Sequence, residues 1–323
     1  MRTPGSSIAK NLSDITGFNT RRHIYFAGFV AASIIIFWNT LSTLVFFSLH
    51  EESSSHIILI PAVSIYLLYT ERGRIFQFVR TDALPGVLLI LTGVVLHWPA
   101  AARHAVIGHL PVLSAAMLSL VLVWIGAFTV FYGTSALRAA AFPLAFLLLM
   151  VPIPESILAR TVYLLQDGST NIAYFLFRAL RVPVLRQGFL LTVPGVTIEV
   201  AAECSGIRSS MALFITCVIA GHLFLRTAWK KFLFVLFAFP LALLKNGIRI
   251  VALTLLSVYI DPSFLTGNLH HRGGFVFFLL ALAILAPVLM LFEKLERMQT
   301  PVVPVVPAKT ESAPPASLMV KRP

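Results

Sequence analysis

The sequence predicts an all-α, polytopic integral membrane protein with about eight transmembrane helices. Of its 323 residues, 58% are hydrophobic and only 12% are charged, whereas charged residues make up about a quarter of ordinary soluble domains. The apolar residues form runs of the length that spans a bilayer as an α-helix, about 17 to 25 residues. The formal net charge is +12, but the basic residues lie in short connections and tails between these runs. Such a distribution is typical of cytoplasmic loops, and it argues against nucleic acid as a partner.

The apolar runs are the predicted spans, and they divide the chain into three regions. We expect a cytoplasmic N-terminal segment (1–23), a transmembrane domain (24–293) and a cytoplasmic Pro-rich tail (294–323) that is extended and disordered. In order, the predicted spans are residues 24–48, 55–70, 84–102, 110–132, 137–154, 206–225, 232–258 and 274–292.

The stretch between the fifth and sixth spans has a different character. Residues 155–182 are interrupted by polar and charged side chains, which predicts an amphipathic helix lying flat at the membrane interface. Residues 183–202 combine β-branched residues with Gly and Pro, which predicts a short extended hairpin. The interrupting residues of the helix are Glu155, Arg160, Gln166, Asp167, Asn171, Arg178 and Arg181.

Basic residues set the predicted orientation. With a cytoplasmic N-terminus, most Lys and Arg fall inside and the acidic, serine-rich loop "HEESSSH" (50–56) falls outside. This predicts a multi-pass protein of the cell (inner) membrane whose flat helix, hairpin and sixth-span start lie at the outer face. The cationic or potentially cationic residues that break the inside rule are expected at that same face: Arg208, Lys245, Arg249, His270, His271 and Arg272.

Cys204 is the first candidate for chemistry. It lies at the start of the sixth span, where unpaired N–H groups and the helix dipole favour a thiolate. Cys217, in the apolar stretch "FITCVIA", is expected to be core. Two cysteines of this kind cannot form a disulfide framework or a structural zinc site, and no metal or organic cofactor is implied. The alternative reading of Cys204 is inert packing.

Two further residues are expected at the same membrane depth. Arg249, with Asn246 three residues earlier on the same helical face, lies in an apolar segment where an Arg normally faces a polar cavity or a partner. His270 precedes the last span. A site of this kind would let the thiolate attack a carbonyl while His270 moves protons and Arg249 stabilises charge. A snorkelling role for Arg249 is the alternative.

Together these residues resemble the exosortase and archaeosortase family of membrane cysteine transpeptidases. The matches are Cys204-Ser205-Gly206, the N-x-x-R pair Asn246 and Arg249, and His270 followed by Gly274, in the family's order. The segments "FPLAFLLLMVPIP" and "HIILIPAVSIYLL" also resemble the family, and the likeness runs from about His56 to Phe292.

The resemblance implies protein sorting by a cysteine peptidase or transpeptidase. Its substrates would be exported proteins with a C-terminal signal: a short motif such as Pro-Glu-Pro, a membrane helix and a basic tail. Cys204 would be the nucleophile, Arg249 the transition-state stabiliser and His270 the acid/base. Because a second histidine follows directly, His271 is an alternative candidate for the acid/base. The acyl acceptor is not specified.

Two points stay open at this level. Arg208 is either an interfacial anchor or a ligand for an acidic residue of the substrate motif, since Arg pairs well with carboxylates. The alternative function is a non-catalytic membrane assembly factor or a transporter for an exported polymer. A transporter should show midplane charges or repeated halves, and the sequence has neither.

Overall fold

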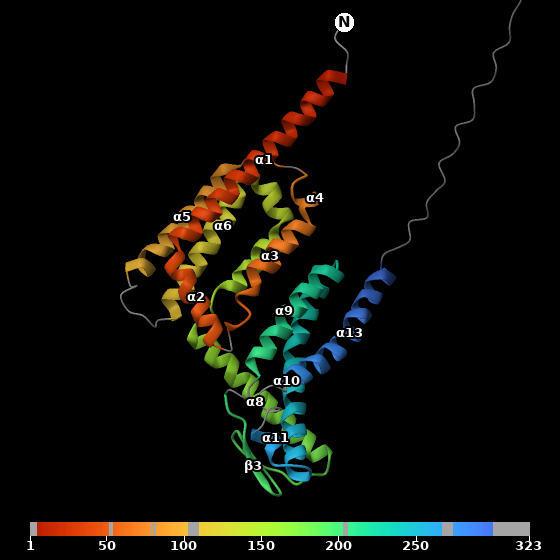
Figure 1. Cartoon of the computed structure of the whole chain (residues 1–323). Helices are drawn as coiled ribbons and strands as arrows, with labels where there is room; N and C mark the ends of the chain where they lie inside the picture. Colours follow the sequence, from red (N-terminus) through yellow and green to blue (C-terminus); the bar gives the residue numbers. More distant parts are fainter. Residues whose placement is uncertain are drawn as a thin grey trace, which may run out of the picture.

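The chain is largely helical in the computed structural model, which describes residues 5–51, 54–77, 79, 82–102, 110–202, 206–266 and 274–299 (Figure 1). The first half comprises α1 (Gly5–Ile36), α2 (Trp38–His50), α3 (Leu59–Thr70), α4 (Arg72–Ile75), α5 (Ala83–Ala102), α6 (Leu110–Ala139), α7 (Ala141–Phe146) and the 3-10 helix η2 (Leu147–Met150). The second half comprises α8 (Glu155–Ala179), β1 (Leu185–Gln187), β2 (Leu190–Val193), β3 (Val196–Glu199), α9 (Ile207–Phe224), α10 (Ala228–Tyr259), α11 (Ser263–Thr266) and α13 (Gly274–Gln299).

Four of the described helices, α6, α9, α10 and α13, are long and apolar enough to cross a membrane. They contain the predicted spans 110–132, 206–225, 232–258 and 274–292 almost completely. The number rises to six if each of two bent helix pairs is counted as one span. The described residues therefore support a multi-pass, mainly α-helical membrane protein, but not all eight predicted spans.

Of the remaining predicted spans, the third (84–102) coincides with α5, and the other three are shortened or bent. The first is broken between α1 and α2 with a bend of 74°, and the second keeps only the 12 residues of α3. The fifth is divided into α7 and η2, and α8 follows after a bend of 91°. Pro152 and Pro154 fall in this bend, and because proline lacks an amide hydrogen and disfavours a preceding helical residue, the helix stops there.

Close packing in the first half depends on small residues. Along α5 and α6, a Cβ added to Gly86 would lie 2.7 Å from the carbonyl oxygen of Gly126, so only glycine permits these backbones to approach so closely. At Gly133 the backbone has φ 87° and ψ 171°, which kinks α6. The gap that hydropathy predicted between residues 132 and 137 is thus a kink inside one assigned helix.

Helix α8 crosses α10 at a second close contact. A Cβ on Gly247 of α10 would lie 2.5 Å from Cγ2 of Ile172, and one on Gly168 of α8 would lie 2.8 Å from Cδ2 of Leu243. Gly247 lies between Asn246 and Arg249, so this crossing fixes the part of α10 that carries both polar residues.

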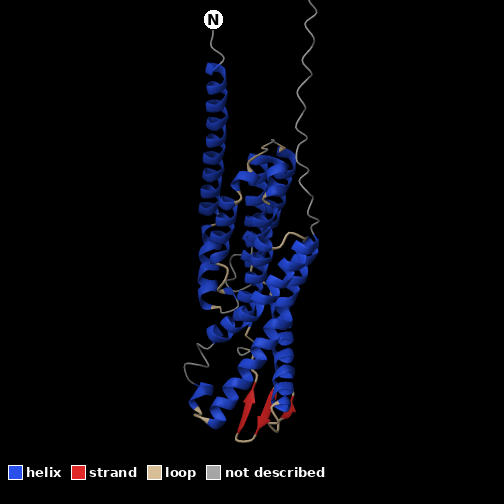
Figure 2. Ribbon diagram, turned by 90° about the vertical axis from the view of Figure 1, so that its right-hand side faces the viewer, coloured by secondary structure: helices blue, strands red, loops and turns tan. Residues whose placement is uncertain are grey.

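The extended segment is a three-stranded antiparallel sheet with strand order β1-β2-β3, one strand more than the predicted hairpin. Leu185 pairs with Thr192, and Leu190 pairs with Glu199. Leu191 and Val193 of β2 are buried in a cluster that includes Phe177 of α8 and Val251 of α10. The sheet lies at the end of the molecule opposite the N-terminus (Figure 2).

Candidate functional site

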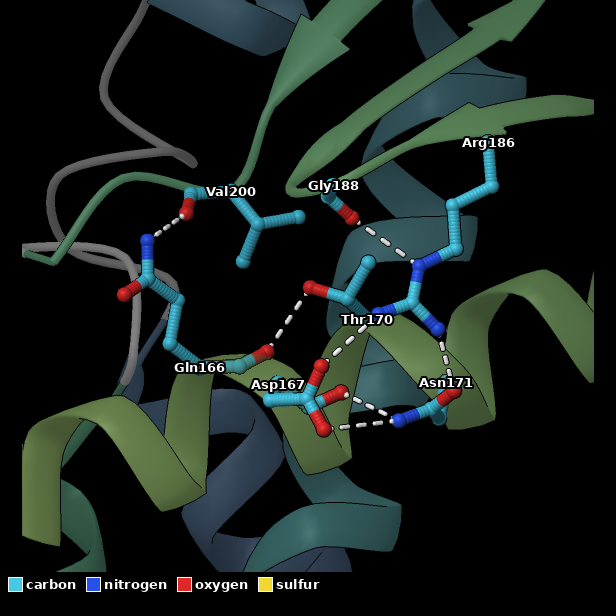
Figure 3. A network of polar contacts seen from close by, with 7 residues as sticks. All are labelled: Gln166, Asp167, Thr170, Asn171, Arg186, Gly188 and Val200. Carbon is cyan, nitrogen blue, oxygen red and sulfur yellow. Dashed lines mark hydrogen bonds and ion pairs between the residues drawn. The ribbon is translucent and has the colours of Figure 1, made fainter.

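A polar network fastens the sheet to α8 (Figure 3). The Arg186 guanidinium donates through Nη2 to Oδ1 of Asp167 at 2.7 Å, through Nη1 to Asn171, and through Nε to the Gly188 carbonyl at 2.9 Å. Asn171 in turn donates to Oδ2 of Asp167 at 3.0 Å. The planar fork of an Arg suits such a set of acceptors, so Arg186 holds β1 in one position on the helix.

A second bond of this network reaches the chain just before the candidate nucleophile. Nε2 of Gln166 donates to the Val200 carbonyl at 2.5 Å, and the Val200 amide donates to the Phe189 carbonyl at 3.0 Å. Val200 is four residues before Cys204 in sequence. The sequence identified Gln166, Asp167 and Asn171 only as the polar face of a helix, because a partner such as Arg186, distant along the chain, leaves no periodic signal.

The start of α9 is built on a glycine. Gly206 is the N-cap residue, with φ 73° and ψ 24°, a left-handed conformation that residues with a side chain rarely adopt. Its carbonyl accepts the Ser210 amide at 2.9 Å and the Ser209 hydroxyl at 3.1 Å. Cys204, two residues earlier in sequence, lies outside the described residues, as do His270 and His271.

Asn246 of α10 lies directly against this turn. A Cβ on Gly206 would be 2.9 Å from Oδ1 and 3.2 Å from Cγ of Asn246, and the Asn246 side chain is buried. The structure therefore brings together one residue from each of two predicted motifs, C-S-G and N-x-x-R. Arg249, one turn further along α10, is half-buried, and Arg208 in the first turn of α9 is exposed.

Lys245 makes a contact with Ser209 that the sequence did not predict. Its side chain is only 1% exposed, and its ammonium donates to the Ser209 hydroxyl. In sequence Lys245 was one of several cations expected near the outer face. Its spacing from Arg249, four residues, places both on one side of a helix, but nothing local showed that Ser209 would meet it.

A cavity of about 130 Å³ is lined by His56 from the segment before α3, by residues of the α7–α8 bend and by Met211 of α9. Most of its lining is apolar, including Leu148, Leu149 and Pro152. His56, which the sequence placed at the outer end of a span, thus lies beside the C-terminal half of the molecule at the cavity. The cavity has the character of a site for apolar groups rather than for catalysis.

These observations define a multi-pass membrane protein with a polar cluster where α9 begins beside α10. Residues 38–287, well over half of the chain, match the model of the transmembrane exosortase family (Exosortase_EpsH). The chain belongs to this family. No curated protein and no solved structure matches it in these comparisons.

Proposed function

We propose that this chain is a membrane cysteine transpeptidase or protease that cleaves a C-terminal sorting signal on exported proteins. The signal consists of a short motif, a membrane helix and a basic tail. The observation that carries the proposal is the family match, whose range includes positions 204, 249 and 270. The contact between Asn246 and Gly206 supports it, because it joins the segments that hold Cys204 and Arg249 in sequence.

The proposed reaction proceeds through a thioester. The Cys204 thiolate attacks the carbonyl carbon of the scissile peptide bond, the carbon–nitrogen bond breaks, and His270 gives a proton to the leaving amine. An acceptor, water or an amine, then attacks the thioester while His270 takes its proton, and the thiolate is restored. Arg249 stabilises the oxyanion that forms in both steps. His271 is the second candidate for the acid/base.

The remaining polar residues support substrate binding in this proposal. Asn246 holds the turn after Cys204, and the exposed Arg208 binds the acidic residue of the substrate motif through charge-assisted hydrogen bonds. The site faces the outer side of the cell (inner) membrane, where exported proteins present their signals. The polar network of α8 then holds the sheet beside the path of the substrate peptide.

The test is processing of a substrate in cells. We expect the wild-type chain to shorten a co-expressed protein that carries a motif, a membrane helix and a basic tail, as read by mass on a gel. Cys204→Ala and Cys204→Ser should leave it intact, because both remove the thiolate. Cys217→Ala is the matched control: Cys217 is fully buried in α9, so its loss should leave processing unchanged.

The opposite outcome is equally clear. If Cys204→Ala shortens the substrate at the wild-type rate, Cys204 is packing. The chain would then be a non-catalytic assembly factor or a transporter for an exported polymer, which needs no thiol.

A further inference from the structure

Lys245 is a buried cation in a membrane-spanning helix. Its side chain is 1% exposed within α10, and taking an ammonium out of water carries a large free-energy penalty. Among the described side chains, no carboxylate forms an ion pair with it. An apolar residue of similar length would fill the same space without that cost, so packing does not explain a lysine at this position.

The contacts of Lys245 lead to one place. Its ammonium donates to the Ser209 hydroxyl, and the same hydroxyl donates to the Gly206 carbonyl at 3.1 Å. A hydroxyl can accept one bond while donating another, so the two bonds form a chain from α10 to the N-cap of α9. The next residue, Asn246, packs against Gly206 itself. Two consecutive residues of α10 therefore hold this turn.

Positive charge lies close to Lys245 as well. Arg249, four residues further along α10, is near enough to interact electrostatically with it, and the start of α9 carries the positive end of the helix dipole. Positive groups aimed at a position where negative charge develops stabilise a thiolate or an oxyanion, most strongly where water is excluded. The position of these groups and the positive sign of their charge thus suit a reaction that passes through a thiolate and an oxyanion.

We propose that Lys245 is a positioning residue of the exosortase site, a proposal that rests on the function proposed above. Through Ser209 it fixes the Gly206 turn that follows Cys204 in the chain. With Arg249 it also makes the start of α9 electropositive, so that negative charge developing there is stabilised.

The first measurement is charge-selective alkylation of Cys204 in the intact membrane-embedded chain, in a Cys217→Ala background. Iodoacetate is anionic and iodoacetamide is neutral. The rate of alkylation by iodoacetate divided by the rate by iodoacetamide therefore reports positive charge near the thiol, and a general loss of reactivity does not change it. In Lys245→Met we expect this ratio to fall about fivefold, the effect of removing one nearby charge from a site partly shielded by solvent. Labelling of the Cys204→Ala variant gives the background.

A matched control lies on the same helix. Lys230 is also buried, at 7% exposure, but it lies in the first turn of α10, near Glu296 and about four turns from Lys245. Lys230→Met should keep the wild-type ratio. Ser209→Ala retains the ammonium but removes its link to Gly206, so both reagents should change rate together and the ratio should stay within about twofold of wild type, since the charge itself remains.

Processing is the second readout. Lys245→Met should lower kcat at least tenfold and change KM little, because the residue acts on the reacting groups rather than on substrate binding. An alkylation ratio equal to that of Lys230→Met, or wild-type turnover in Lys245→Met, would overturn the proposal. Failure of the proposed function is distinguishable, because alkylation needs no substrate and Cys204→Ala would then process normally.

Discussion

At the residue scale, Gly206 is the position where backbone conformation and tertiary contact impose the same requirement. Its φ of 73° disfavours any side chain, and Asn246 occupies the space that a Cβ would need. Each demand alone would select glycine. Together they make glycine the residue that fits this position in the turn after Cys204.

Gly206→Ala should therefore abolish or strongly reduce substrate processing and lower stability by about 1–3 kcal/mol, from backbone strain and the displacement of Asn246. Gly188→Ala is the control, because Gly188 has φ 62° but nothing within 4 Å of an added Cβ. Gly188→Ala should lose only the stability that backbone strain costs, and it should process the substrate at the wild-type rate. The measurements are the thermal midpoint in detergent and the gel assay. Equal processing by the two variants would show that the Asn246 contact is dispensable.

At the scale of elements, Arg186 provides the polar attachment of β1 to α8. Arg186 bonds to Asp167, Asn171 and Gly188, and the buried face of β2 completes the attachment. The Asp167 side chain is 40% exposed, so solvent screens the ion pair and its share of global stability is small. Its effect is expected in local order instead.

Arg186→Ala should speed amide hydrogen exchange in β1 and β2 severalfold, while the thermal midpoint changes little, because local opening becomes easier without loss of the core. Arg186→Lys should give nearly the same result, since an ammonium cannot reproduce the fork of bonds. Arg178→Ala, an exposed position on the same helix α8, is the control. Unchanged exchange in the strands of Arg186→Ala would contradict the anchoring role.

At the scale of the whole molecule, one polar contact between the two halves joins the α3–α4 junction and α7 to α9. His222 of α9 bonds through Nε2 to Oε1 of Glu71 at 2.6 Å, and its ring stacks on Phe142 with centroids 3.6 Å apart. Both polar side chains are less than a fifth exposed. The pair holds the helix that carries Gly206 against the first half of the chain.

Glu71→Gln should lower the free energy of unfolding by about 1.5–3 kcal/mol, the usual contribution of a hydrogen bond to a charged group, and the thermal midpoint should fall by several degrees. The control uses the other partner of Glu71: Arg74, whose side chain is 65% exposed, so Arg74→Ala should cost less than about 1 kcal/mol. If the two variants unfold at the same temperature, the His222 bond does not hold the halves together.

The sequence by itself determined the class of protein, the positions of its long apolar helices and the residues that resemble a known family. Each of these features depends on residues that are close together in the chain. Hydropathy is averaged over some 20 positions, and the family motifs are only a few residues long. The β-branched residues, Gly and Pro that marked residues 183–202 as extended are local in the same way, although they did not reveal that the segment has three strands.

Only the tertiary structure decided which polar groups meet. Hydropathy indicated a change of direction where the polar-interrupted helix 155–182 begins, but it cannot give the 91° angle of that bend. It also cannot show that Lys245 reaches Ser209, or that Arg186 reaches Asp167. Such contacts join residues that are distant in sequence, so they depend on how the elements pack. At Gly206, for example, the absence of a side chain leaves room for Asn246 beside the start of α9.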